Sequence, residues 1–385
     1  MPTIASPRTL LAFATTISLA VQGAPVSAQG QPPAITPAAP AGGFAMFAPN
    51  PSGVGTRLDF TFWDQALGYF VFPMGRSLRQ GMIRPDASLG TRQVYGHDSR
   101  YRMEGNRVAF EYLTPEIIAS LTEYRLDLQR IASETDITRL PRNQQLAFWF
   151  NLHNVALVEQ IALAYPVSQP RSLRLGSEQA LLDEAPFIDI RGQKLSLRDI
   201  RTRIVYPNWR DARVIYGFWR GDIGGPSIQT RAFTGANLDT LLDETARDFV
   251  NSLRGTQKTG SRLEVSTLYE EARSFYFPAF GADLLAHFQE FADPTTEGLI
   301  ARTSQIDARI SEPDIADLAK GENDPNHSFV WSGDRMRSTR INPAIARLLT
   351  ERADKLEEIE KRGERRGTVT IYDIYVPGAE AAEIE

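Results

Sequence analysis

Three polar side chains, Asn151, His153 and Asn154, interrupt the most apolar stretch of the 385-residue sequence, which runs from residue 146 to 164. A buried amide or imidazole without a partner costs roughly 1 to 3 kcal/mol, so these groups need partners on other elements. In one interpretation the asparagines bind a backbone segment, and His153 is a satisfied core residue beside Trp149. In the other, His153 is a general acid or base in a cleft, which its ordinary pKa permits. The sequence leaves both interpretations open.

The second segment with chemical potential is the loop from Trp219 to Ile228. It follows Arg213 to Phe218, which we predict to be a buried strand, and loops at strand ends often carry ligand sites. Gly224 and Gly225 allow a sharp turn that exposes backbone amides, so an anion could bind there with help from Arg220. The alternative is a plain connecting turn.

Ser227 and Asp222 add a hydroxyl and a carboxylate to the same loop. Ser227 does not lie in a nucleophile elbow, because Gln229 stands where that turn requires glycine. His153 could still act together with Ser227 or with a carboxylate such as Asp222. An exported hydrolase or transferase that uses His153 is therefore the catalytic alternative.

Composition excludes several classes of chemistry. The sequence has no cysteine, so thiol nucleophiles, disulfides and cysteine-bound zinc are excluded. Its four histidines stand singly, and no complete dinucleotide or phosphate-loop fingerprint occurs, so we expect no metal and no cofactor. The formal net charge of -5 gives no footprint for nucleic acid. Hydrophobic residues make up 42% of the chain, which is enough for a full core.

The amino terminus predicts export. Arg8 precedes an apolar run from Leu10 to Val21, and Val26-Ser27-Ala28 fits the small-x-small site of signal peptidase, so we expect cleavage after Ala28. About 12 apolar residues are too few for a membrane span, which needs about 20, so no stable transmembrane anchor should remain after cleavage. We expect a periplasmic protein, with secretion possible. Its partner is unknown, with an envelope protein or a small-molecule ligand as candidates.

Periodicity and capping residues predict an α+β fold with a single main domain. A small mixed or antiparallel sheet is expected, packed by helices around a buried central helix, 143–164. The other predicted elements are helices near 62–70, 115–131 and 343–362, a helix capped by Thr234 that reaches Leu253, and helical segments from Ser266 to Phe291. A capping box is predicted at Ser196 and Asp199, a hairpin at 187–195, and strands at 213–218, 262–265 and 368–376. The predicted divisions are a signal peptide (1–28), a Pro/Gly-rich linker (29–56), an N-terminal extension (57–113), the main domain (114–292), a polar connector (293–341) and a C-terminal helix and strand (342–385).

The main domain resembles the domain of unknown function 547 family. The resemblance is carried by the segments 143–154, 187–200, 213–228, 233–251 and 265–292, in the same order and at similar gaps. The sequence keeps the family's aromatic-Trp-x-Asn-x-Tyr-Asn helix, with His153 at the tyrosine position. It departs at the reactive positions: Ile215 stands where the family has histidine, Arg220 and Gly225 where it has cysteines, and Trp219 where it has asparagine.

These substitutions favour a non-catalytic or degenerate module that acts in binding or envelope-associated assembly. The catalytic alternative requires an accessible His153 near the loop. A third possibility is that residues 303–376 dock on the domain and cover the same cleft.

Overall fold

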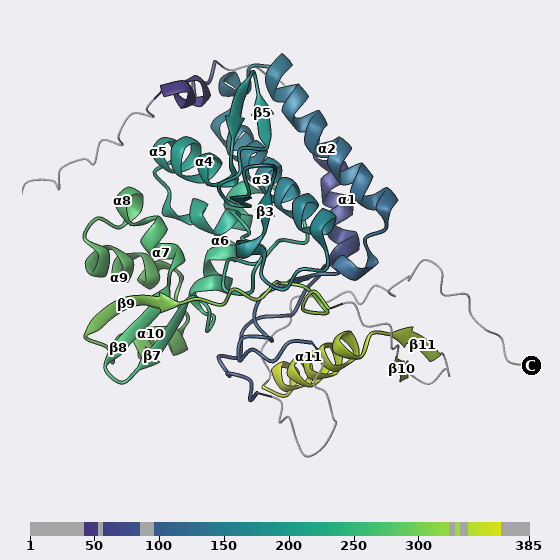
Figure 1. Cartoon of the computed structure of the whole chain (residues 1–385). Coiled ribbons are helices and arrows are strands. Elements are labelled where there is room, and N and C mark those ends of the chain that lie inside the picture. Colours follow the sequence, from purple (N-terminus) through teal and green to yellow (C-terminus); the bar gives the residue numbers. More distant parts are fainter. Residues whose placement is uncertain (1–41, 53–56, 85–95, 323–327, 332–337, 363–385) are drawn as a thin grey trace, which may run out of the picture. The chain divides into compact units, whose positions relative to one another are not determined.

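The central helix is α3, Arg142–Ala164, and every residue from Gln145 to Glu159 is buried. A helix that is apolar on all sides must be enclosed by other elements, and α3 lies in the middle of the molecule in Figure 1. The helix ends at Ala164, with Tyr165 as its C-cap, because Pro166 has no amide hydrogen to continue the ladder. The predicted central helix is confirmed, with its first residue one position earlier.

The computed structural model describes residues 42–52, 57–84, 96–322, 328–331 and 338–362 (Figure 1). The chain divides into two units, Met1–Thr36 and Pro37–Glu385, and all the described residues belong to the second. The predicted signal peptide, 1–28, and the predicted strand 368–376 lie outside the described residues.

Helix α2, Pro115–Glu134, packs along α3. It begins as the sequence predicts, because the Thr114 hydroxyl accepts from the Ile117 amide at 3.4 Å and Pro115 takes the first position. A buried ion pair joins the two helices: Arg125 Nη2 donates to Glu159 Oε1 at 3.0 Å, and Nε bonds to the second oxygen. The shorter helix α1, Thr61–Phe70, is also confirmed.

A hairpin and a capping box precede the loop region. Strands β5, Ile188–Ile190, and β6, Gln193–Leu195, pair across Arg191 and Gly192, both of which have positive φ, as a two-residue type I′ turn requires. The capping box of Ser196 and Asp199 is confirmed. It opens α4 (Leu197–Asp199), which continues into the π-helix η5 (Ile200–Val205) and α5 (Tyr206–Asn208).

The strand predicted at Arg213 to Phe218 is wrong. The segment Ala212–Gly217 is the 3-10 helix η6, which packs on α6, Leu238–Val250. Asp211 starts the helical turn, because its Oδ1 accepts from the Arg213 amide at 2.9 Å. A short apolar run that is buried on all sides has no periodicity that distinguishes strand from helix, and the cap decides the outcome here.

The sheets are small, as predicted. The largest described sheet is mixed: β7, Thr256–Thr259, pairs antiparallel with β8, Arg262–Ser266, which pairs parallel with β9, Gln305–Ile310. The remaining strands form two-stranded antiparallel sheets: β1 (Val71–Phe72) with β2 (Arg107–Val108), β3 (Arg174–Leu175) with β4 (Ala180–Leu181), and β10 (Ser328–Trp331) with β11 (Ser338–Ile341). With these sheets set among the helices, the α+β fold class is confirmed. The other elements are η1 (Gly42–Phe47), η2 (Phe110–Tyr112), η3 (Ile137–Arg139), η4 (Pro170–Ser172), α7 (Leu268–Glu271), α8 (Arg273–Tyr276), α9 (Phe280–Phe291) and α10 (Pro294–Ile300).

Segments outside the predicted main domain are packed into the same unit. Phe44 and Phe47, inside the predicted linker, are buried in the main core, because two aromatic rings outweigh the surrounding proline and glycine. Strand β9 lies inside the predicted polar connector. The C-terminal helix α11, Pro343–Lys361, begins at Asn342 as predicted and covers a second small core. The residues of that core are Met74, Met103, Leu318, Ala319, Ala344, Ile345 and Leu348.

In the described part of the chain, no helix combines the length and the apolarity needed to cross a membrane.

The buried pair between α2 and α3 predicts an asymmetric response to mutation. Glu159→Ala leaves Arg125 charged and unpaired in the interior, so we expect a loss of about 3 to 5 kcal/mol in the free energy of unfolding, measured by urea denaturation. The matched control is Glu134→Ala, which breaks the exposed pair with Arg130 and should cost less than about 1 kcal/mol. Equal losses in the two variants would contradict the assignment.

Candidate functional site

The two asparagines of α3 bind backbone on other segments. Asn151 Nδ2 donates to the Phe233 carbonyl at 2.7 Å, and its Oδ1 accepts from the Phe233 amide at 3.1 Å. Asn154 donates from Nδ2 to the Gly217 carbonyl at 3.0 Å and accepts at Oδ1 from the Trp219 amide at 3.1 Å. Each side-chain amide thus pairs with backbone as a neighbouring strand would. These contacts match the structural interpretation of the asparagines.

Trp149 lies in the core on the same helix. It is fully buried, and its ring makes an edge-on contact with Phe47 at a centroid distance of 5.4 Å. The contact is apolar and holds the segment that precedes α1 against the central helix.

His153 is fully buried, and both ring nitrogens are engaged. Nε2 lies 3.0 Å from Arg201 Nη1, and Nδ1 lies 3.0 Å from Asn154 Oδ1. An arginine can only donate, so Nε2 must accept, and Nδ1 must carry the hydrogen that it donates to Asn154. This arrangement fits only the neutral imidazole. Burial lowers the pKa of His153 well below its usual value, and the charges of Arg201 and Arg220 lower it further.

Arg201 connects His153 to a group of charged side chains at the surface. Its Nη1 and Nη2 each donate to one oxygen of Asp183 at 2.7 Å, and it also bonds to Glu271 at 3.2 Å. Arg220 donates to the same Glu271 carboxylate. The Arg201 side chain has no exposed surface, whereas 41% of the Asp183 side chain and 25% of the Glu271 side chain are exposed. We call Asp183, Arg201, Arg220 and Glu271 the charge cluster.

The charge cluster keeps its carboxylates ionised. Burial disfavours the charged form of Asp183, but the paired Arg201 outweighs it and lowers the pKa of Asp183 to about 2. Glu271 is also buried in part, yet Arg220 and Arg201 hold its pKa below the ordinary value. The two arginines and the two carboxylates of the charge cluster therefore balance one another in charge, and Arg201 joins the cluster to the neutral His153.

The backbone amides of the predicted anion-binding loop are already bonded. Ile223 and Gly224 donate to the carbonyls of Asp314 and Glu312 at 2.9 and 3.0 Å, and Gly225 donates to Asp222 Oδ1 at 2.8 Å. Residue 224 must be glycine, because a Cβ there would lie 2.6 Å from the Glu312 amide nitrogen. The segment 312–316 thus lies along the loop, inside the region that we expected to dock on the domain.

Ser227 and Asp222 are held by partners other than His153. Ser227 Oγ donates to Asp248 Oδ2 at 2.9 Å and accepts from Arg254 Nη2 at 3.0 Å. Asp222 is buried and pairs with Arg171. Burial raises its pKa, although the charge of Arg171 opposes the shift. No hydrogen bond between described residues joins His153 to Ser227 or to Asp222.

Sequence reasoning missed Arg201, Asp183 and Glu271. Asp183 and Glu271 lie far from Arg201 in the sequence. Aspartate and glutamate are also common on protein surfaces, so nothing in the sequence distinguishes these two from other exposed carboxylates. The available signal was at Arg201, which follows Leu197 by four residues and precedes Ile204 by three. Helical spacing places it on the buried face of that segment, and a buried arginine requires acidic partners.

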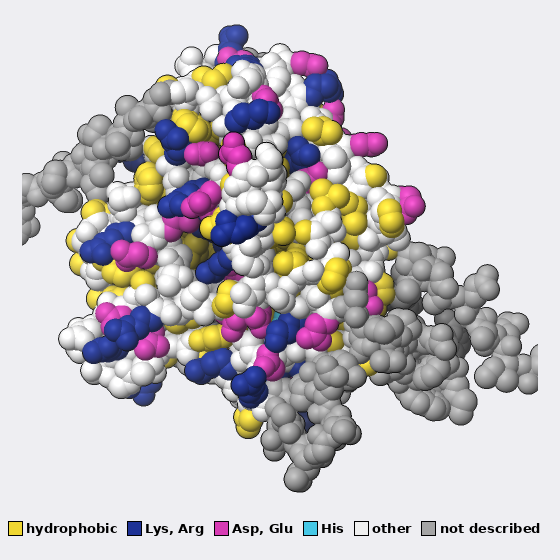
Figure 2. Space-filling view, in the orientation of Figure 1, with side chains coloured by type: hydrophobic (Ala, Val, Ile, Leu, Met, Phe, Trp, Pro, Cys, Tyr) yellow, Lys and Arg dark blue, Asp and Glu magenta, His cyan; other side chains and the backbone are white. Residues whose placement is uncertain are grey.

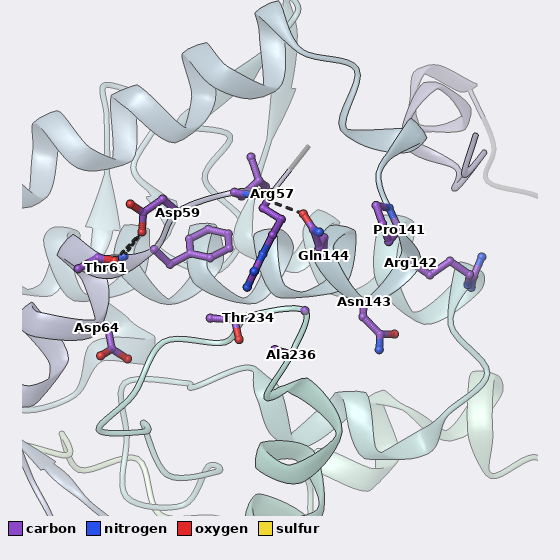
Figure 3. Close-up of a pocket in the computed structure, with 13 residues that line it drawn as sticks. Arg57, Asp59, Thr61, Asp64, Pro141, Arg142, Asn143, Gln144, Thr234 and Ala236 are labelled. Carbon is purple, nitrogen blue, oxygen red and sulfur yellow. Dashed lines mark hydrogen bonds between the residues drawn. The ribbon is translucent and has the colours of Figure 1, made fainter. Parts of the chain in front are cut away.

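A pocket lies away from these residues. It has a volume of about 740 Å³ and is formed where the starts of α1 and α3 meet the turn before α6. Figure 3 shows Arg57 extending toward Thr234, with Gln144 beside it. None of the predicted site residues, and no member of the charge cluster, lines this pocket.

On the face shown in Figure 2, basic and acidic side chains are interspersed, so no single-sign patch for a polyanion is visible there. Within the described ranges, no group of three or more histidine, aspartate or glutamate side chains could hold a metal ion.

Fold and contacts define an α+β domain in which a buried helix holds the loop after η6 through side-chain amides. Residues 137–250 match the family model DUF547, described as "Protein of unknown function, DUF547", and the chain is a DUF547 domain-containing protein. The match contains α3, the hairpin, the loop and α6, and it is shorter at both ends than the expected range, 114–292. Comparison with curated proteins and with solved structures found no match.

The contacts of His153 predict that it stays neutral in mildly acidic solution. We expect the imidazole ¹⁵N shifts of folded protein to report the neutral Nδ1–H tautomer down to pH 5, while the urea-unfolded chain titrates near pH 6.5. Because the folded pKa is depressed, this contribution to stability is present above about pH 6.5 and is lost as pH falls, by up to about 1.4 kcal/mol per pH unit. A folded-state midpoint above pH 6 would contradict the assignment.

Proposed function

We propose that this protein is an exported, non-catalytic binding module in which the reactive positions of a DUF547 domain have become structural. The observation that carries the proposal is the environment of Arg220, which stands at a cysteine position of the resembled family. Its guanidinium pairs with Glu271. Glu271 also accepts from Arg201, which donates to the buried His153. An ion pair occupies the place where that family would present a nucleophile.

The chemistry of the remaining candidates supports the same proposal. A general base needs a free lone pair within reach of the proton that it removes. The lone pair of His153 points at Arg201, and its N–H points at Asn154. Ser227 donates to Asp248, but Arg254 donates both to that carboxylate and to the Ser227 hydroxyl, so one lone pair of each group is already engaged.

A binding role is supported by the available concave surface. The pocket shown in Figure 3 has polar walls from Arg57, Thr61, Asn143 and Gln144, and its volume of about 740 Å³ is in the range of small-molecule sites. Export is supported by the sequence from Met1 to Ala28, and it would place this pocket in the cell envelope or the medium. A small polar ligand or an envelope protein is the proposed partner.

The non-catalytic assignment predicts no turnover by purified residues 29–385. Peptide, ester and glycan substrates should be processed at the rate of the buffer alone, as followed by mass spectrometry. The alternative, a hydrolase or transferase, predicts turnover that His153→Gln abolishes and that Arg231→Gln, a change in an exposed ion pair, leaves intact. Turnover with that pattern would overturn the non-catalytic proposal.

Export is tested separately. Expressed from its full sequence in a Gram-negative host, the protein should be recovered from the periplasm with Gln29 as its first residue, as read by intact-mass analysis. Replacing Leu11 and Leu19 by Arg should retain the uncleaved chain in the cytoplasm, because the apolar run of the signal is broken. Recovery of full-length wild type from the cytoplasm alone would contradict export and leave the binding assignment untouched.

A further inference from the structure

The inference concerns Lys355, a buried amine on α11. Only 7% of the residue is exposed, and Nζ donates to the Met103 carbonyl at 2.8 Å and to the Gly75 carbonyl at 3.3 Å. A protonated lysine has three N–H donors, whereas the neutral amine has two and one lone pair. These two carbonyls match the donor count of the neutral form.

The surroundings of Lys355 raise the share of the neutral form. Burial lowers the pKa of Lys355 to about 8. The charged groups that face it act in both directions: Glu104 and Asp248 raise the pKa, and Arg107 and Arg254 lower it. The other acidic groups near the amine, from α11 itself, are Glu351, Asp354 and Glu358. With a pKa of about 8, roughly a tenth of the amine is unprotonated at pH 7.

Lys355 also lines a pocket. The cavity has a volume of about 150 Å³, with apolar walls from Leu78, Met82 and Met103. Its rim is acidic and includes the exposed Asp354, and Gln80 at the rim is also exposed. The space admits a molecule of a few heavy atoms, and the rim repels anions.

We propose that Lys355 is a nucleophilic amine that forms an imine with a small, uncharged aldehyde in this pocket. Nζ attacks the carbonyl carbon, the new C–N bond forms, and a proton moves from nitrogen to oxygen to give a carbinolamine. That intermediate loses water, whose oxygen comes from the aldehyde, and leaves a C=N bond without any change in oxidation state. The imine nitrogen then takes up one proton from water, and this protonated imine has one N–H for the Met103 carbonyl.

This site is independent of the proposed function, because neither the charge cluster nor the larger pocket contributes a residue to it. It also differs from the ordinary surface lysines. The Lys361 side chain, on the same helix, is 70% exposed and pairs with Glu357. Lys361 is therefore the internal reference for reactivity.

The test is competitive labelling of folded residues 29–385 at pH 7 with glycolaldehyde and cyanoborohydride, followed by peptide mass spectrometry. The hydride traps each imine as a stable amine. We expect Lys355 to be labelled at least about tenfold faster than Lys361, since its neutral fraction is roughly a hundredfold larger. In urea the two lysines should react at similar rates. Labelling of folded Lys355 no faster than Lys361 would overturn the proposal.

Two controls define the ligand class. Glyoxylate has a similar size but carries a negative charge, so the ratio of glycolaldehyde to glyoxylate labelling should be several-fold higher at Lys355 than at Lys361. Equal ratios would refute the preference for an uncharged aldehyde. Lys355→Arg should lose only the adduct at position 355, and Lys361→Arg only the adduct at 361. If Lys355→Arg does not fold, the comparison within the wild-type protein still decides the proposal.

Discussion

The requirement that buried polar groups be satisfied organises the centre of this protein. Helix α3 is enclosed by apolar side chains, yet it carries two asparagines and a histidine that cannot reach water. Each asparagine therefore pairs with backbone beyond the helix, at Phe233 and at residues 217–219. These bonds hold the start of the loop 219–228 and the turn before α6 against α3. The positions of the loop and of α6 depend on them.

The same requirement explains the charge cluster. His153 needs a donor at Nε2, Arg201 supplies it, and a guanidinium without exposed surface needs anions in turn. Asp183 and Glu271 provide them, and Glu271 also accepts from Arg220. A chain of partners thus runs from the core to the solvent. One member of this chain, Arg220, stands at a position where the resembled family has a cysteine, and there its guanidinium is held by Glu271.

Much of the fold followed from local pattern. Thr114 with Pro115, the capping box at Ser196 and Asp199, and Asn342 with Pro343 each mark a helix start through interactions within four residues. The segment 213–218 could not be assigned this way, because full burial removes the periodicity that separates strand from helix. The same holds for the candidate site. The buried amides of α3 predict that hydrogen-bond partners exist, but which residues these partners are depends on the tertiary structure. Residues 183, 201 and 271 meet only after the chain has folded.

The hydrogen bonds between the segment 312–316 and the loop show that the packed unit of this protein extends beyond the family match. The family match ends at residue 250, but the carbonyls that receive the Ile223 and Gly224 amides belong to Asp314 and Glu312, more than 60 residues further along. A fragment cut at the ends of the match would expose those amides and lose the buried contacts of Phe44 and Phe47 with the core. The stretch that matches the family model is therefore shorter than the stretch that packs together, and a transplanted domain would need both flanks to keep these contacts.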